Sequence, residues 1–155
     1  RVAFRPVDLV ALPAGIAGQL LLVPVLYWPL QRWWPDTFSD EELEERALDL
    51  VDRASGSTTV LLVIVVVVGA PFFEELVYRG LLQRSVAVVV GRWWGWILAS
   101  AWFSLIHLTP VEYPGLFAAG LLFGACLLLT DRLGPAILAH LAFNATGLAI
   151  AFNAA

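Results

Sequence analysis

Long runs of apolar residues are the feature that most constrains this chain. The first covers residues 9–30 and is interrupted only by Gln19, and a second extends from residue 58 to residue 90 around one charged motif. A helix of about 20 apolar residues can span a bilayer, because it satisfies its own backbone hydrogen bonds there. The chain is 60% hydrophobic and only 14% charged, unlike soluble domains of this size. We therefore expect a polytopic membrane protein, and its missing initial Met indicates a processed or excised segment.

Three further apolar stretches follow, at residues 93–108, 115–130 and 135–152. Gly69 and Pro71 predict a kink or break within the second run, because both residues weaken a helix at that point. Trp residues near a membrane surface act as interfacial anchors, and small residues four apart allow close helix packing. The chain offers such anchors at Trp93, Trp94 and Trp96, and a small-residue pair at Gly120 and Gly124. We expect an all-α transmembrane bundle of about five or six membrane helices.

The polar segment between the first two runs, residues 31–57, carries most of the acidic residues behind the net charge of −4. Ser39 and Glu42 form a capping box, which marks a helix start. The pairs Glu42–Arg46 and Asp49–Arg53 favour helix, because residues four apart share a face. Leu43, Ala47, Leu50, Val51 and Ala54 line the apolar face. The segment predicts an amphipathic surface helix, and charge confined to one acidic segment gives no sign of nucleic-acid binding.

Two units are therefore expected: residues 1–57, with the first membrane helix and the acidic surface helix, and residues 58–155, with the remaining helices. The sequence indicates no particular oligomeric state. The lone Cys126 has no partner for an internal disulfide.

Charged residues interrupt the apolar runs at a few positions. The sequence PFFEELVYRGLLQR, residues 71–84, places Glu74, Glu75 and Arg79 within a run that otherwise reads as membrane helix. His107 and His140 occur later in comparable surroundings. Ionisable groups are expensive in a membrane and usually face a cavity or each other. These residues are therefore candidates for one functional site.

Each polar set has helical spacing. Glu75 and Arg79 are four apart and can pair, and the same spacing relates Phe103 to His107 and His140 to Asn144. Taken singly, each set has a structural explanation: an ion pair for the first and satisfied buried histidines for the others. A proton or ion path is a further reading of Glu and His in a membrane. Three such sets, on successive helices that carry polar residues, favour a functional site.

The turn expected at Gly91 brings two of these residues to one depth. Glu74 lies 17 residues before Gly91 and His107 lies 16 after it, so both are roughly 25 Å from the turn at ~1.5 Å per residue. His140 follows Gly134 by only six residues. Straight helices would leave His140 at a different level from the other two.

Two chemistries suit these residues, and both would hydrolyse an amide. A carboxylate and an imidazole that converge can activate water, while a second imidazole and an amide can stabilise an oxyanion. Alternatively, Glu74, His107 and His140 could ligate Zn²⁺ or another divalent metal, with water at the open position.

The combined pattern resembles the CAAX protease and bacteriocin-processing family, also known as CPBP or Abi, whose members are intramembrane endopeptidases. The resemblance covers about residues 58–152 and leaves residues 1–57 unmatched. It rests on three motifs in order, with no departure at the motif positions: Glu74-Glu75-x-x-x-Arg79, Phe103-x-x-x-His107 and His140-x-x-x-Asn144.

The resemblance implies specific roles for these residues. Glu74 would be the general base, and His107 would help it activate water. His140 and Asn144 would stabilise the oxyanion, with Glu75 and Arg79 as a supporting ion pair. Family members are described both as metalloproteases and as metal-independent glutamate proteases. We favour the glutamate type without a cofactor, because the acid–histidine pair is complete without metal and Asn144 is a better oxyanion donor than ligand.

The resemblance also implies a peptide or membrane-protein substrate and a place in the lipid bilayer, here expected to be a bacterial plasma membrane. Processing of peptides and self-immunity to bacteriocins are roles it suggests, whereas nothing in the sequence marks a prenyl pocket. Two alternatives remain. One is a non-catalytic immunity or scaffold protein that retains the motifs as a polar network. The other is a proton-coupled carrier.

Overall fold

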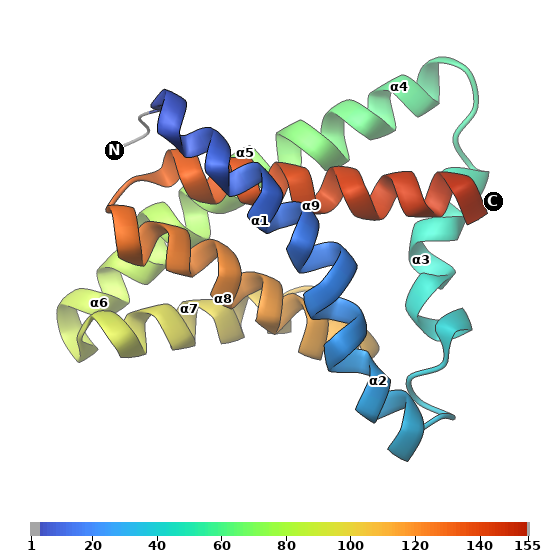
Figure 1. Cartoon of the computed structure of the whole chain (residues 1–155), viewed down its shortest axis with the longest axis horizontal. Helices are drawn as coiled ribbons and strands as arrows, with labels where there is room; N and C mark the ends of the chain where they lie inside the picture. Colours follow the sequence, from blue (N-terminus) through green and yellow to red (C-terminus); the bar gives the residue numbers. More distant parts are fainter. Residues whose placement is uncertain (1–3, 155) are drawn as a thin grey trace.

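The computed structural model describes residues 4–154, without the side chains of residues 40, 41 and 44–47. This part of the chain is built of helices and short connections, without strands (Figure 1). The predicted all-α fold is confirmed. Four helices are long and apolar enough to cross a membrane: Pro6–Trp33, Ser57–Val90, Pro110–Thr130 and Leu133–Ala154. The fifth predicted membrane helix, α7 (Arg92–Leu105), has 14 residues, which is shorter than a spanning helix requires.

The first two spans each contain π-helical turns. The first consists of η1 (Pro6–Val10), α1 (Ala11–Ala17), η2 (Gly18–Leu22) and α2 (Val23–Trp33), of which η2 is a π-helix. The second consists of α4 (Ser57–Val63), η3 (Ile64–Gly69), α5 (Ala70–Glu75), η4 (Leu76–Gln83) and α6 (Arg84–Val90), with π-helices at η3 and η4. Such turns insert a residue into a helix and are frequent at functional sites.

The second span passes through Pro71 without a break, and the irregularity expected there is the π-helical turn η3. The N–H of Ala70 bonds to the carbonyl of Val65, five residues back. The next bond of this pattern would join the carbonyl of Val66 to an N–H of residue 71, but residue 71 is a proline and has no N–H. The carbonyl of Val66 is therefore left without that backbone donor, and the side chain of Asn144 supplies one at 3.0 Å.

The acidic amphipathic helix forms as expected, at α3 (Asp40–Asp52). Ser39 Oγ accepts the Glu42 N–H at 3.2 Å, and Arg53 pairs with Asp49 at 2.7 Å. Val51 is buried against Leu148 and Ala151 on the last helix. Leu50 departs from the prediction, because its side chain is exposed. The predicted Glu42–Arg46 pair and the place of Ala47 lie outside the described side chains.

The hairpin after the second span turns at Gly91, as predicted, with a positive φ of 88° that suits glycine. Trp93 and Trp94 are exposed, as interfacial anchors would be. Trp96 differs, because its indole N–H donates to the carbonyl of Leu121 at 2.9 Å and so packs α7 onto α8.

The helix α8 (Tyr113–Thr130), preceded by the short η5 (Pro110–Glu112), uses its two glycines as a packing face. A Cβ on Gly120 would lie 3.1 Å from Ser100 atoms, and one on Gly124 would lie 2.6 Å from Trp96. The predicted small-residue face is therefore confirmed. It lets α7 and α8 pack so closely that side chains reach the α8 backbone.

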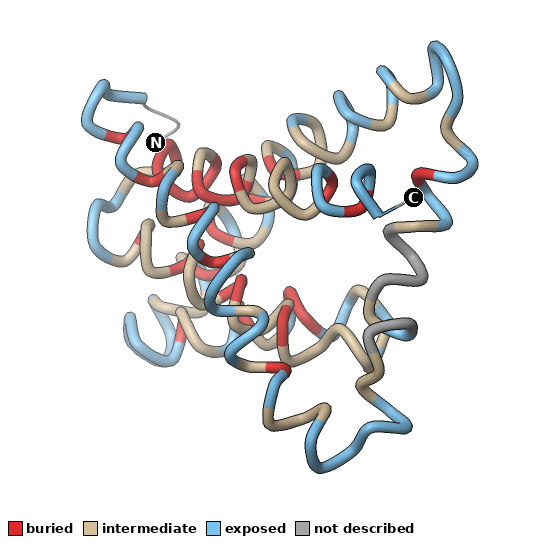
Figure 2. The backbone as a smooth tube through the Cα atoms, turned by 45° about the vertical axis from the view of Figure 1, so that its right-hand side comes forward, coloured by how far each residue is buried: buried red, intermediate tan, exposed pale blue. Residues whose placement is uncertain are grey.

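The last helix, α9 (Leu133–Ala154), is the most buried element, as the red segments in Figure 2 show. It runs antiparallel to the second span, and successive contacts step along both helices: Leu133 with Gly80, His140 with Glu75, and Asn144 with Val66. On its other side α1 crosses closely. A Cβ on Gly15 would lie 2.0 Å from the carbonyl oxygen of Ala139.

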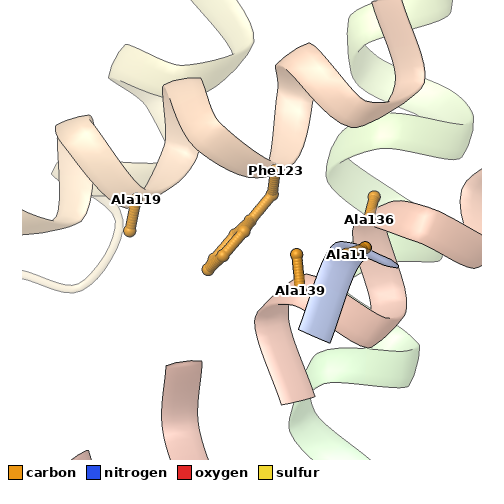
Figure 3. Close-up of a cluster of buried hydrophobic side chains, with 5 residues drawn as sticks. All are labelled: Ala11, Ala119, Phe123, Ala136 and Ala139. Atoms are coloured by element: carbon orange, nitrogen blue, oxygen red, sulfur yellow. The ribbon is translucent and has the colours of Figure 1, made fainter. Parts of the chain in front are cut away.

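The buried apolar cluster that holds α9 consists mainly of small side chains (Figure 3). Phe123 is the large member, with 0% exposure. Small residues at helix crossings let backbones approach closely in a membrane, where water does not drive helices together. The cluster contains Ala11, Ala119, Phe123, Ala136 and Ala139.

Candidate active site

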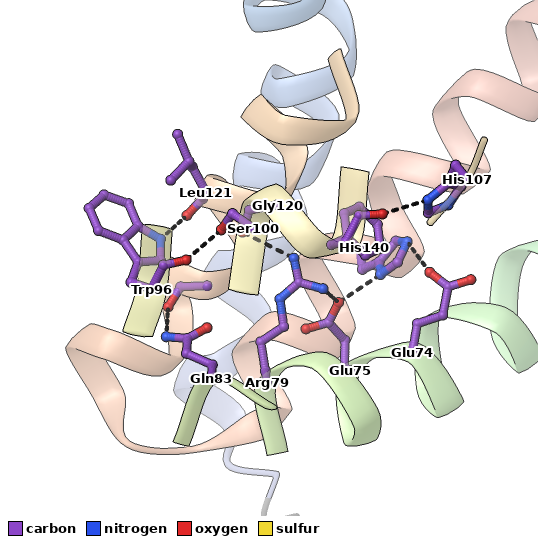
Figure 4. Close-up of polar contacts among 12 residues, drawn as sticks. Glu74, Glu75, Arg79, Gln83, Trp96, Ser100, His107, Gly120, Leu121 and His140 are labelled. Atoms are coloured by element: carbon purple, nitrogen blue, oxygen red, sulfur yellow. Dashed lines mark hydrogen bonds and ion pairs between the residues drawn. The ribbon is translucent and has the colours of Figure 1, made fainter. Parts of the chain in front are cut away.

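The centre of the polar network is Glu75, whose side chain is fully buried. Its Oε1 receives Nη1 of Arg79 at 2.8 Å and Nδ1 of His140 at 2.8 Å. Figure 4 shows the three side chains converging from the second span and α9. The predicted Glu75–Arg79 pair is thus present, and it also fixes a histidine. A buried charge requires such partners, because its desolvation is otherwise very unfavourable.

Arg79 extends the network to α8. Its Nη2 donates to the carbonyl of Gly120 at 3.0 Å, and its guanidinium lies 4.6 Å from the ring centre of Phe103. One turn later, Gln83 donates to the carbonyl of Gly124 at 3.2 Å. The two glycines leave their carbonyls open to these side chains. Arg79 therefore joins the second span, α7 and α8 around one buried charge.

His140 is clamped on three sides. Phe123 stacks on its ring with centres 4.3 Å apart and planes 16° apart, and Phe103 meets it edge-on with ring centres 5.9 Å apart. An arginine-paired carboxylate accepts hydrogen bonds, so Nδ1 of His140 carries the proton that points to Glu75. This leaves Nε2 facing Glu74, whose Oε2 is 3.8 Å away. That separation is too long for a direct hydrogen bond.

His107 repeats this arrangement with a backbone partner. Its Nδ1 lies 2.7 Å from the carbonyl oxygen of Phe103, and its ring meets the Phe103 ring at 4.9 Å. A carbonyl oxygen only accepts, so Nδ1 is the donor and Nε2 of the neutral ring keeps its lone pair. Both imidazoles are therefore held through Nδ1–H and present Nε2. His107 is the more exposed of the two.

The two carboxylates of the motif differ sharply. The Glu74 side chain is 30% exposed, whereas that of Glu75 is 0% exposed and paired. Glu74 also lies near the middle of its span, 17 residues from Ser57 and 16 from Val90. The result is one structural carboxylate and one accessible carboxylate in the membrane interior.

The expected meeting of Glu74 and His107 is not a direct contact. Among the residues that the structure describes, no hydrogen bond or ion pair joins them, and Glu74 is nearest to His140 (Figure 4). Asn144 also points elsewhere, to the carbonyl of Val66.

His140 reaches the level of Glu74, which the turn-counting argument did not predict. Asp131 in the α8–α9 turn is bound by Arg84 at 3.0 Å. Arg84 lies ten residues beyond Glu74, and His140 follows Asp131 by nine residues, so this contact brings Glu74 and His140 to similar levels. Leu133 then lies against Gly80, where an added Cβ would be 3.2 Å from its side chain.

The three residues of the alternative metal set, Glu74, His107 and His140, do not come together as ligands. Across residues 4–154, no group of three or more His, Cys, Asp or Glu side chains is placed to hold a metal ion. Glu74, His107 and His140 would have to converge first, so we derive no step through a metal.

Sequence analysis missed several residues of the site, chiefly Phe123, Gln83 and Ser104. One signal was available for Gln83. It follows Arg79 by four residues, as Gly124 follows Gly120, so the two pairs match turn for turn. Phe123 had no such signal, because an apolar residue in an apolar run carries no information about which ring it meets. Ser104, which donates to the carbonyl of Tyr113 at 2.8 Å, was equally unmarked.

A helical bundle with spanning apolar helices and a buried acid–histidine network defines an integral membrane protein with an interior polar site. The sequence profile of the type II CAAX prenyl endopeptidase Rce1-like family matches residues 56–146, more than half of the chain. The chain therefore belongs to this family, which is a family of proteases. No curated protein and no solved structure matches the chain significantly.

Proposed function

We propose that the chain is an intramembrane endopeptidase in which Glu74 activates water to hydrolyse a peptide bond. The observation that carries this proposal is the contrast between the two adjacent carboxylates. Glu75 is buried and bound at Oε1 by both Arg79 and His140, whereas Glu74 is accessible and 3.8 Å from an imidazole nitrogen. A general base must be free to take a proton and must lie within reach of the water.

In the proposed reaction, Glu74 takes one proton from water as the oxygen attacks the carbonyl carbon of the substrate. Nε2 of His107 accepts a hydrogen bond from the other O–H of that water and orients it. The carbonyl oxygen becomes an oxyanion, and the carbon–nitrogen bond breaks as Glu74 returns its proton to the leaving amine. The products are a carboxylic acid and an amine, and transfer of the acid's proton to the amine leaves a carboxylate and an ammonium group.

Two side chains are proposed to stabilise the oxyanion. Protonated His140 would donate from Nε2, with its positive charge compensated by Glu75 through Nδ1–H. Asn144 would donate the amide hydrogen that Val66 does not use. Donors fixed in advance at a developing negative charge are among the largest contributions to catalysis. His140 is well fixed, since Phe123 and Glu75 hold its ring.

The substrate class that we propose is a peptide or membrane protein, cleaved in the bilayer of a bacterial plasma membrane. Bacteriocin processing or immunity belongs to the same proposal. We further propose that the mechanism is of the glutamate type.

The experiment compares new protein N-termini in membranes of cells that carry the native chain or Glu74→Gln at matched expression. Glu42→Gln, on the exposed surface of α3, is the matched control. N-termini that disappear with Glu74→Gln and persist with Glu42→Gln would establish a protease and identify its substrates. Identical N-termini from all three folded proteins would reject the proposal.

The second candidate, a non-catalytic immunity or scaffold protein, is favoured by one observation. Arg79 and Asn144 already serve backbone carbonyls, as purely structural groups would. In that case Glu74→Gln would retain the cellular function.

A further inference from the structure

One polar residue inside a span has no role in the network described above. Gln19 is 13 residues from the start of the first span at Pro6 and 14 from its end at Trp33. Like Glu74 in the second span, it therefore lies at the midpoint of its own span. An uncharged amide at mid-bilayer is still unfavourable unless something binds it.

Gln19 belongs to a π-helical turn, η2. The other two π-helical turns build the candidate site: η4 contains Arg79, and η3 exposes the carbonyl that Asn144 binds. The irregular turn around Gln19 is thus of the same kind as those at the site. Gln19 points inward, whereas the next two residues of the same turn, Leu20 and Leu21, are exposed on the outer surface.

Gln19 lines a cavity of about 590 Å³ between the first span, α3, α8 and α9. This volume lies within the range of ligand pockets in proteins. The walls are mainly apolar, and they include Tyr27, Leu48, Leu116, Phe143 and Gly147.

Within the part of the chain that the structure describes, the amide of Gln19 has no hydrogen-bond partner. Other polar groups of the cavity are already engaged. The hydroxyl of Tyr27 donates to the carbonyl of Val111 at 2.8 Å and accepts the N–H of Gly115 at 3.1 Å. Gln31 and Glu112 also have partners. Among the described residues, Gln19 therefore brings to this cavity two donors and one acceptor that the free protein does not use.

The position of Gln19 relative to the site follows from α9. A Cβ on Gly147 would lie 3.4 Å from Nε2 of Gln19, so the amide rests against this glycine. Gly147 is seven residues beyond His140, which is about 10 Å and nearly two full turns, so both lie on almost the same face of α9. An extended peptide covers about 10 Å with three residues.

We propose that Gln19 binds the main chain of the peptide substrate about three residues from the cleaved bond, with the neighbouring substrate side chain in the apolar cavity. The proposal rests on the proposed function. An amide side chain offers one acceptor and two donors, which match the N–H and carbonyl of one peptide unit. A lipid tail has neither group and would leave the amide unpaired.

The test uses the purified full chain in lipid nanodiscs and the best-cleaved peptide from a proteome-derived peptide library. In a set of analogues, each amide of this peptide is replaced in turn by an ester, which removes one N–H and weakens one carbonyl. For the native protein, kcat/KM is expected to fall roughly five- to tenfold for one ester two to four residues from the cleaved bond. For Gln19→Leu, KM is expected to rise by a similar factor with kcat retained, and that ester should have no further effect.

The controls separate binding from folding. Leu20→Ala changes an exposed neighbour on the same turn and should leave KM unchanged. The thermal midpoint of Gln19→Leu should not fall, because the native amide stabilises nothing in the free protein. If the native protein cleaves every ester analogue with unchanged kcat/KM, the proposal is overturned. An unchanged KM in Gln19→Leu would also overturn it. Absence of cleavage by the native protein, or equal cleavage by Glu74→Gln, would reject the proposed function itself.

Discussion

Nδ1 of His140 lies 2.8 Å from Oε1 of Glu75, and the same oxygen receives the guanidinium of Arg79 at 2.8 Å. One carboxylate oxygen therefore fixes both the arginine that ties the second span to α8 and the histidine that faces Glu74. Structural integrity and the orientation of the candidate site depend on one buried charge.

Removing one partner of the buried ion pair should lower the unfolding free energy more than replacing both partners with apolar residues. Arg79→Leu leaves Glu75 charged, buried and without its cation, so we expect a loss of about 3–5 kcal/mol of unfolding free energy. The double variant Glu75→Leu/Arg79→Leu removes both charges and should recover a large part of this loss. Denaturant unfolding in detergent micelles, followed by Trp fluorescence, would measure both.

Arg53→Leu is the matched control, because Arg53 and Asp49 form an exposed pair with the same four-residue spacing. Such pairs contribute roughly 0–1 kcal/mol. An Arg79→Leu variant as stable as Arg53→Leu would contradict the assignment of Arg79 as the counter-charge of Glu75.

The two histidines should respond differently to truncation. His140 is buried between Glu75 and Phe123, whereas His107 is half-buried and bonded only to the carbonyl of Phe103. We expect His107→Ala to lower cleavage by at least about 100-fold with little change in thermal midpoint. His140→Ala should lower both. Parallel cleavage assays and thermal melts would check this, and equal loss of stability in the two variants would contradict it.

The sequence was informative about chemistry and less so about depth. Charged residues in an apolar run are rare enough to mark a site, so Glu75, Arg79 and His140 could be recognised. Helical spacing could pair Glu75 with Arg79, but it could not show that His140 also binds Glu75. The level of His140 could not be predicted, because it depends on which residue of the second span meets the α8–α9 turn, and no local pattern indicates that Arg84 binds Asp131. Turn counting measures Glu74 from Gly91 and His140 from Gly134, and the sequence defines no common level for these two turns.

The direction of Asn144 was also beyond sequence analysis. Its spacing from His140 predicts a shared face, and the two residues do lie on one side of α9. The Asn144 amide instead donates to the carbonyl of Val66 in the second span. That carbonyl is available because Pro71 has no N–H to continue the π-helical pattern. That coupling needs both the π-helical register and the pairing of the two helices, neither of which is encoded in a local pattern.

Chelation should leave cleavage intact if the mechanism is of the glutamate type. Dialysis against EDTA and then 1,10-phenanthroline is expected to reduce kcat/KM by less than about twofold, because Glu74 and His107 would activate water by proton transfer alone. Restoration by Zn²⁺ of activity lost on dialysis would favour the alternative set of Glu74, His107 and His140 as ligands. The metal content of the purified protein would provide an independent check.

Asn144 and Pro71 should be energetically coupled through the carbonyl of Val66. Asn144→Leu removes the donor at 3.0 Å and leaves that carbonyl unpaired, so we expect a loss of about 1–3 kcal/mol of unfolding free energy. In a Pro71→Ala background, a backbone N–H can take over, and the same substitution should be less destabilising by about 1 kcal/mol. The double-mutant cycle measures this difference directly.

The same cycle tests the proposed catalytic role of Asn144. If Asn144 also stabilises the oxyanion, restoring stability with Pro71→Ala should not restore cleavage, because alanine provides no donor to the substrate. Cleavage that recovers together with stability would show that Asn144 acts only by completing the helix interface, and the oxyanion would then depend on His140 alone.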